Sequence, residues 1–498
     1  MFSPAMVGRW IGWIGMAHLH LGRLLPAHNH MQEALVYLGF PAVPNQVLPF
    51  DRAVCLAKEA CLARGPGRDS DDTLFAASLY GAIADISIKA GMGGNLVFIN
   101  RLVRVTTRSI EFMDYTHEGV RLVVNLAHEE LAKGHQDKVE MLLDRALALS
   151  TDIGDPITRG IALIASGRYN AGEGLVAEAE EDFAEAFEMF APAGDYSRCG
   201  EVVVESAYVK LCSGATQEAL SMFNEVRDTA IVHKNDFLSQ QASLHGAALV
   251  HAITLSTAEA SACLAQMRTI VEEDWARRRG RRGRTAAATE GTSHASLVVM
   301  ETLDAYLAAS RGDGKAALKG VHRASLRLSQ PGALRFSSGL FLHLATDACF
   351  TILEQQDMLP PGPDAHRKIL AAARLLIRTL GKFAQAFDLM SPLHQLGRAR
   401  WSLLHGMDKV AEKALELGLV ISEEDVHFPF AEGLLLLHST RIESLPMEER
   451  RARARRGRRT LHRIGACLIP PADRHRNQKK KPGGGVDAGA PSTAPAVV

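Results

Sequence analysis

The sequence is poor in aromatic residues, which make up 6% of its 498 residues, and in alternating Val/Thr-rich runs. These residue types are enriched in strands, so their scarcity disfavours a β-sandwich or a β-barrel. Long apolar runs are missing as well, because His343 and Asp347 interrupt the best candidate, residues 337–353. A membrane-spanning helix is therefore not predicted.

The sequence also has no paired cysteines. Its seven cysteines never form a C-x-x-C pair, which argues against a disulfide framework or a zinc site. They are typical of reduced thiols in an intracellular protein, and we predict a cytoplasmic location, with the nucleus as the alternative. The seven are Cys55, Cys61, Cys199, Cys212, Cys263, Cys349 and Cys467.

Catalytic and cofactor motifs are missing too. The sequence has no Walker phosphate loop, no H-E-x-x-H and no G-x-S-x-G. Four histidines, His18, His20, His28 and His30, are the one metal-like group, but His-x-His spacing places two rings on different faces of a helix. The sequence therefore predicts a protein that is not an enzyme, without catalytic residues, cofactor or metal.

Charge is balanced overall, with 56 basic and 56 acidic residues, but it is unevenly distributed. Residues 450–481 hold 13 Lys and Arg, and residues 277–284 hold six, so the rest of the chain is acidic. Without interleaved aromatic residues, neither basic segment indicates base stacking, and a solvated loop and tail are the simpler interpretation. The candidate anion-binding residues are Arg277, Arg278, Arg279, Arg281, Arg282, Arg284, Arg455, Arg456, Arg458 and Arg459.

What the sequence does have is a repeat. Glycines recur between amphipathic stretches, with a small residue seven positions before each glycine and small residues about five and twelve positions after it. An apolar residue stands nine positions after each glycine. The signature positions are Gly15, Gly22, Ala27, Ala34, Ala127, Gly134, Ala146, Gly167, Gly174, Ala179, Ala186, Ala207, Gly214, Ala219, Ala305, Gly312, Ala317, Ala324, Ala399, Gly406 and Ala411.

This pattern predicts pairs of closely packed helices. Small residues let two helix backbones approach where they cross, and the glycine ends the first helix in a left-handed cap. Residues 9–440 resemble the tetratricopeptide repeat, although His18 and Glu130 replace bulky aromatic residues and the Gly134–Gly174–Gly214 spacing is longer than usual. Trp10 and Trp13 are interpreted as buried repeat aromatics. The resemblance implies an all-α, right-handed solenoid.

A closer resemblance rests on two segments, GRWIGWIGMAHLHLGRLLPAHNHMQEALVYLGFPAVP at 8–44 and residues 380–441. Both are similar to the C-terminal helical-repeat region of multidomain AAA-type ATPase and class III adenylate/guanylate cyclase signalling proteins. The family's nucleotide loops and metal carboxylates have no matching positions here. The abrupt apolar start, without a polar capping helix, favours a piece of a longer protein, a truncated gene model or a paralogue that lost its enzymatic half.

The resemblance implies a non-catalytic scaffold that binds a protein or peptide on the concave solenoid surface, as the sensory part of a signalling ATPase or cyclase. One alternative is a subunit or fragment of a cyclase-type enzyme whose catalytic domains lie elsewhere. Another is a nucleic-acid-associated regulator that uses the Arg-rich segments. The oligomeric state stays open.

We expect four segments along the chain. Residues 1–275 form an N-terminal tetratricopeptide-like array, residues 276–294 a mobile basic loop, and residues 295–446 the C-terminal continuation of the array. Residues 447–498, rich in basic residues, Gly and Pro, are predicted to be a disordered tail, because they show no apolar period.

Overall fold

The computed structural model describes residues 3–43, 70–89, 96–107, 116–239, 245–254, 256–279, 294–328, 336–359 and 363–466. Within these ranges the regular elements are all helices and no strand occurs, which confirms the predicted all-α fold. No helix among these residues is both long and apolar enough to cross a membrane.

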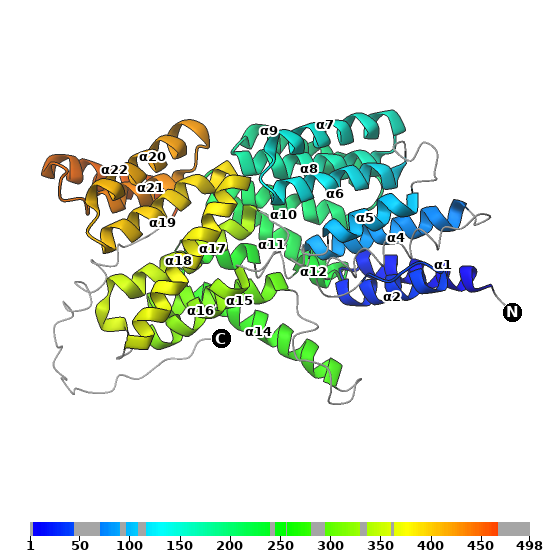
Figure 1. The fold of residues 1–498 in the computed structure, drawn as a ribbon, viewed down its shortest axis with the longest axis horizontal. Coiled ribbons are helices and arrows are strands. Elements are labelled where there is room, and N and C mark those ends of the chain that lie inside the picture. Colours follow the sequence, from blue (N-terminus) through cyan, green and yellow to red (C-terminus); the bar gives the residue numbers. More distant parts are fainter. Residues whose placement is uncertain are drawn as a thin grey trace, which may run out of the picture.

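The helices pair in chain order into helical hairpins, each named here by its two helices (Figure 1). The first five hairpins are α1 (Pro4–His20) with α2 (Leu24–Tyr37), α4 (Ser70–Lys89) with α5 (Leu96–Thr107), α6 (His117–Ala132) with α7 (Gln136–Ile153), α8 (Pro156–Glu173) with α9 (Val176–Phe190), and α10 (Tyr196–Cys212) with α11 (Thr216–Val232).

Five more hairpins follow: α13 (Ala248–Ile253) with α14 (Thr257–Arg279), α15 (His294–Ser310) with α16 (Gly314–Leu328), α17 (Phe336–Glu354) with α18 (Pro363–Ala386), α19 (Ser391–Leu404) with α20 (Asp408–Val420), and α21 (Pro429–Ser439) with α22 (Met447–Arg463). The short elements are α12 (Asp236–Ser239), η4 (Gln356–Met358), η5 (Asp388–Met390) and the π-helical η6 (Ile421–Asp425).

First helices of neighbouring hairpins contact one another from α1 to α10 and again from α15 to α21. Helix α6 contacts α4 on one side and α8 on the other, and α17, α19 and α21 follow the same order. A hairpin cannot bury both of its faces by itself, so stacking on its neighbours completes the core. The described chain is thus an α-solenoid.

The turn inside each regular hairpin is built on a glycine in the left-handed region. Gly134, Gly174 and Gly214 have φ values of 75°, 85° and 91°, and Gly22, Gly312 and Gly406 behave alike. A side chain at such a φ clashes with the following carbonyl, so glycine is the residue that closes these turns without strain.

Small residues lie where the two helices of a hairpin cross. Every signature alanine is at most 2% exposed. At Gly167 a Cβ atom would lie 2.7 Å from the Phe183 ring, and at Gly15 it would lie 2.9 Å from Met31 Cγ. The large side chain of one helix therefore fills the space that the small residue of the other leaves.

The predicted boundary at residue 446 is wrong, because Met447–Arg463 form helix α22. Despite its arginines, α22 buries Gly457, Thr460 and Leu461, and a Cβ atom on Gly433 of α21 would lie 2.5 Å from Leu461 Cγ. This narrow apolar face was too short to show as a period in the sequence. Residues 467–498 lie outside the described residues.

The predicted basic loop at 276–294 also needs correction at its start. Helix α14 continues through Arg279, so the first residues of that segment are helical. Residues 280–293, with Arg281, Arg282 and Arg284, lie outside the described residues.

Hairpins far apart in sequence also touch. A Cβ atom on Gly174 would lie 2.7 Å from Val426 Cβ, and one on Gly214 would lie 2.5 Å from Ile464 Cγ2. Thr216 Oγ1 donates a 2.6 Å hydrogen bond to the Ile464 carbonyl. The turns of hairpins α8–α9 and α10–α11 thus rest on the ends of hairpins α19–α20 and α21–α22, so the solenoid curls back onto itself.

We predict that Gly174→Ala destabilises the protein more than Gly312→Ala. Both substitutions place a side chain at positive φ, at a cost of about 1–2 kcal/mol. Only the Gly174 methyl would also push into buried Val426, adding about 1–3 kcal/mol, since nothing lies within 4 Å of the Gly312 position. Urea unfolding followed by circular dichroism measures both; equal losses would contradict the packing of the two hairpins.

Candidate functional site

Ion pairs join neighbouring first helices in the N-terminal half. Arg168 Nη2 on α8 lies 2.6 Å from Glu201 Oε1 and 2.8 Å from Glu205 Oε1, both on α10. Lys89 Nζ on α4 lies 2.7 Å from Glu201 Oε2. Glu201 therefore links three first helices, although α4 and α10 are more than a hundred residues apart.

A second network joins first helices in the C-terminal half. Arg400 of α19, whose side chain is 2% exposed, pairs with Asp347 (2.5 Å) and Glu354 (3.0 Å) of α17. Arg441 lies 2.8 Å from Glu354. Burial opposes ionisation of Glu354, but Arg400, His438 and Arg441 together lower its pKa to about 2.

The same network keeps its histidine neutral. Burial and the nearby Arg400 lower the pKa of His438 to about 3. A general acid or base works best with a pKa near the working pH. The charges of Arg400 and Glu354 stay fixed near pH 7, so this network can hold helices together and is poorly suited to proton transfer.

We predict that Arg400→Met costs about 3–5 kcal/mol of unfolding free energy, because it removes a buried guanidinium that pairs with both Asp347 and the buried Glu354. Arg367→Met is the matched control: its pair with Asp364 is 81% and 74% exposed, and exposed pairs are worth about 0–1 kcal/mol. Urea denaturation at pH 7 distinguishes them. Similar small losses of unfolding free energy in both variants would show that the Arg400 network does not hold α17 and α19 together.

Two acidic residues meet where the solenoid curls back. Burial, followed by the charge of Asp388 in η5, raises the pKa of Glu173 at the end of α8 to about 7. Gln136 Nε2 donates to the Glu173 carboxylate at 3.2 Å, which partly opposes this rise. Glu173 therefore gains its charge near neutral pH.

We predict that Glu173→Gln stabilises the protein at pH 8 and has little effect near pH 4. A folded-state pKa above the ordinary value of about 4.3 means that the folded state keeps a proton that the unfolded state releases, so stability falls as pH rises from about 4.3 to about 7. With allowance for solvent screening, the gain at pH 8 is on the order of 1 kcal/mol. Melting temperatures across this range test it; a gain that does not change with pH would contradict the assignment.

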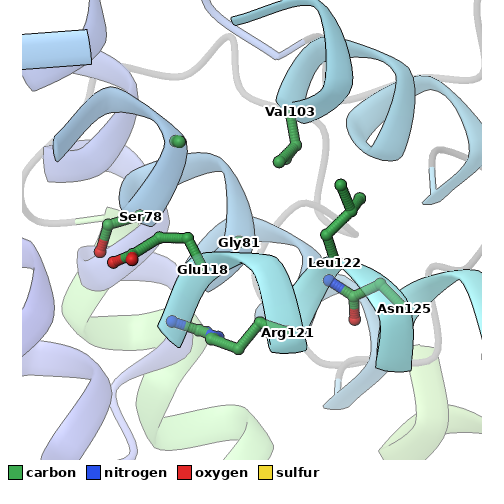
Figure 2. A pocket seen from close by; sticks show the side chains of 8 residues that line it. Ser78, Gly81, Val103, Glu118, Arg121, Leu122 and Asn125 are labelled. Atoms are coloured by element: carbon green, nitrogen blue, oxygen red, sulfur yellow. The ribbon is translucent and has the colours of Figure 1, made fainter. Parts of the chain in front are cut away.

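A narrow crevice separates α4, α5 and α6 (Figure 2). Ser78 and Gly81 of α4, Val103 of α5 and Glu118 of α6 line it, and a Cβ atom on Gly81 would lie 3.6 Å from Arg121 Cζ. Arg121 pairs with Asp85, and the crevice is too narrow for a water molecule. It is a packing seam between hairpins, not a ligand pocket.

The exposed aromatic face of α1 is the feature best suited to binding. Trp13 is 62% exposed and Trp10 48%, with Ile14 and Met6 exposed beside them. This corrects the interpretation of both tryptophans as buried; the ring centroids of Trp13 and Phe75 lie 5.4 Å apart. Exposed aromatic clusters of this kind are typical of protein-binding surfaces.

The repeat register shows what covers this position elsewhere. Trp13 stands nine residues before its turn glycine, as Gly397, Glu205 and Asn125 do in later hairpins. Each of the three contacts the preceding hairpin: a Cβ atom on Gly397 would lie 3.7 Å from Ile377 on α18, Glu205 binds Arg168 on α8, and the Asn125 carbonyl accepts from Asn100 on α5. Trp13 itself contacts Phe75 of α4, in the hairpin that follows.

The structure separates the predicted anion-binding residues. Arg455, Arg458 and Arg459 lie exposed on α22, whereas Arg456 pairs with Glu423 (2.8 Å) and Glu432 (2.9 Å). Arg277, Arg278 and Arg279 end helix α14. The two basic segments therefore do not form one helix or one stripe.

The structure places two of the four histidines against each other and a third beside a glutamine. The His18 and His30 rings stack at 5.3 Å, and His28 lies 3.1 Å from the Gln32 amide. Among the residues that the structure describes, no three His, Cys, Asp or Glu side chains are placed to hold a metal ion.

No family model matches this sequence, and no curated protein matches it. Among solved structures, the chain is similar to a "Circular tandem repeat protein with novel repeat topology and enhanced subunit contact surfaces", with 12% identity, 91% of each chain covered and a TM-score of 0.14. A TM-score this low carries no argument, so the fold assignment rests on the helices and contacts described above.

Proposed function

We propose that this chain is a non-catalytic helical-repeat scaffold that binds protein partners. The observation that carries the proposal is the aromatic face of α1, where Trp10 and Trp13 are exposed and Trp13 stands at a register position that later hairpins use to contact a neighbour. In this proposal the first helices that follow α1 line the concave binding surface. The partner in this proposal is a protein or peptide with an apolar helical face.

Site-specific photocrosslinking in the producing cells tests this proposal. A photoreactive phenylalanine analogue at position 13 should give discrete protein adducts. The same analogue at Val232, which is 76% exposed, serves as the control. Adducts that are the same at both positions, or absent at position 13, would contradict binding by α1.

The resemblance to signalling proteins supports a finer proposal, in which the scaffold is the sensory part of an AAA-type ATPase or a nucleotide cyclase. The purified chain should then neither hydrolyse ATP or GTP nor form a cyclic nucleotide, and an ATPase or cyclase chain should co-purify with it if the catalytic domains lie in another polypeptide. Turnover that survives repeated purification would overturn the non-catalytic assignment.

A further inference from the structure

Two adjacent second helices carry a basic surface that no run of basic residues marks in the sequence. Helices α16 and α18 pack against each other, and each has a stripe of exposed cations. We call this set the basic surface: Lys315, Lys319 and Arg323 of α16, and Arg367, Lys368, Arg374, Arg378 and Lys382 of α18.

The spacing of these residues explains why they form stripes. Lys315, Lys319 and Arg323 stand four apart, and Arg374, Arg378 and Lys382 do so too, which places each set on one side of its helix. The opposite sides carry the core residues, such as Val321 and Leu376, both fully buried. The cations are therefore held outward by the packing of the two helices.

Little acidic charge offsets the basic surface. Helix α16 contains no acidic residue, and α18 contains one, Asp364, which pairs with Arg367 at 2.8 Å. Arg374 lies over the Trp401 ring, 5.3 Å from its centroid, and so is held in place by an aromatic contact. The like charges of this surface repel one another unless an anionic partner covers them.

The same chain carries a complementary surface on α9. This helix contains no Lys or Arg, and Glu178, Glu181 and Glu188 are exposed on it; we call these three the acidic face. Its other glutamates, Glu180 and Glu185, already pair with Lys210 and Arg159. The acidic face is thus what remains after the ion pairs within the molecule have formed.

The two surfaces are similar in length. Glu178 and Glu188 stand ten residues apart on α9, about 15 Å, and Arg374 and Lys382 stand eight residues apart on α18, about 12 Å. Both surfaces are exposed, so they do not cover each other within one molecule. The net charge is zero at pH 7, so copies do not repel one another overall while opposite charges stay segregated on each copy.

We propose that the basic surface of one copy binds the acidic face of α9 in a second copy. The contact is head-to-tail, because it joins two different surfaces, and each copy keeps one free surface of each sign. Association then adds copies in a row unless the geometry closes a ring. Its strength depends on salt, because the pairing charges are exposed.

Sedimentation velocity over a range of protein concentrations tests the proposal. The full chain should show a concentration-dependent increase in weight-average sedimentation coefficient in about 20 mM salt, and this increase should disappear in about 500 mM salt. A chain that stays monomeric in low salt, or associates independently of salt, would overturn the proposal. If the monomer instead binds a DNA duplex, the basic surface serves a nucleic acid.

Charge reversal then locates the contact. Lys319→Glu/Arg378→Glu/Lys382→Glu should weaken self-association at least tenfold, and so should Glu178→Lys/Glu181→Lys/Glu188→Lys. Mixing the two variants should restore association, because each then offers the surface that the other needs. Circular dichroism checks that both variants stay folded.

A matched control separates this contact from net charge alone. Arg451→Glu/Arg455→Glu/Arg459→Glu makes the same change in charge on the exposed side of α22, outside both surfaces. It should keep most of the self-association of the unchanged chain. If it abolishes association as fully as the α16–α18 variant does, or if mixing the two reversed variants fails to restore it, the proposal is wrong.

Discussion

The close approach of two helices at small residues is the constraint on which the rest of this structure depends. Where Gly167 or Gly15 stands, the partner helix brings Phe183 or Met31 into the space left free. That approach sets the distance between helices within a hairpin and thereby the face that the hairpin offers to its neighbour. The ion-pair networks and the contacts between distant hairpins are built on this spacing.

The hairpins could be predicted from the sequence because their determinants are local. A glycine with a left-handed φ and an alanine seven residues before or five residues after it belong to one turn and its two helices, so their spacing is visible along the chain. The stacking order follows, since neighbouring hairpins are consecutive. Ala34, Ala186 and Ala324, which stand at one position of this repeat, are all fully buried.

Other features could not be predicted because their partners are distant or their signal is short. Nothing near Gly174 indicates that Val426 will rest on it, since the two lie 252 residues apart in the sequence. Helix α22 was missed because its buried side is limited to a few residues among arginines. The exposure of Trp13 was missed because periodicity shows which residues share a helix face, not whether a neighbour covers that face.

The candidate surfaces also include some that the sequence reveals and others that only the structure reveals. The Arg-rich runs at 277–284 and 451–459 are conspicuous in the sequence, yet Arg456 is engaged by carboxylates of its own chain. The cations of α16 and α18 are scattered among apolar residues and become one surface only when the two helices pack together. A search for runs of basic residues in the sequence therefore does not find a basic surface that two packed helices form together.

Two contacts join distant hairpins: Thr216 donates a hydrogen bond to the Ile464 carbonyl, and Val426 packs against Gly174. These contacts have a mechanical consequence. An open solenoid behaves as a spring, whose repeats separate one after another and whose length responds to small forces. Here the turns of hairpins α8–α9 and α10–α11 are bound to hairpins α19–α20 and α21–α22. Stretching must therefore first break these contacts. Such a molecule resists extension up to a threshold force, and several hairpins then separate together.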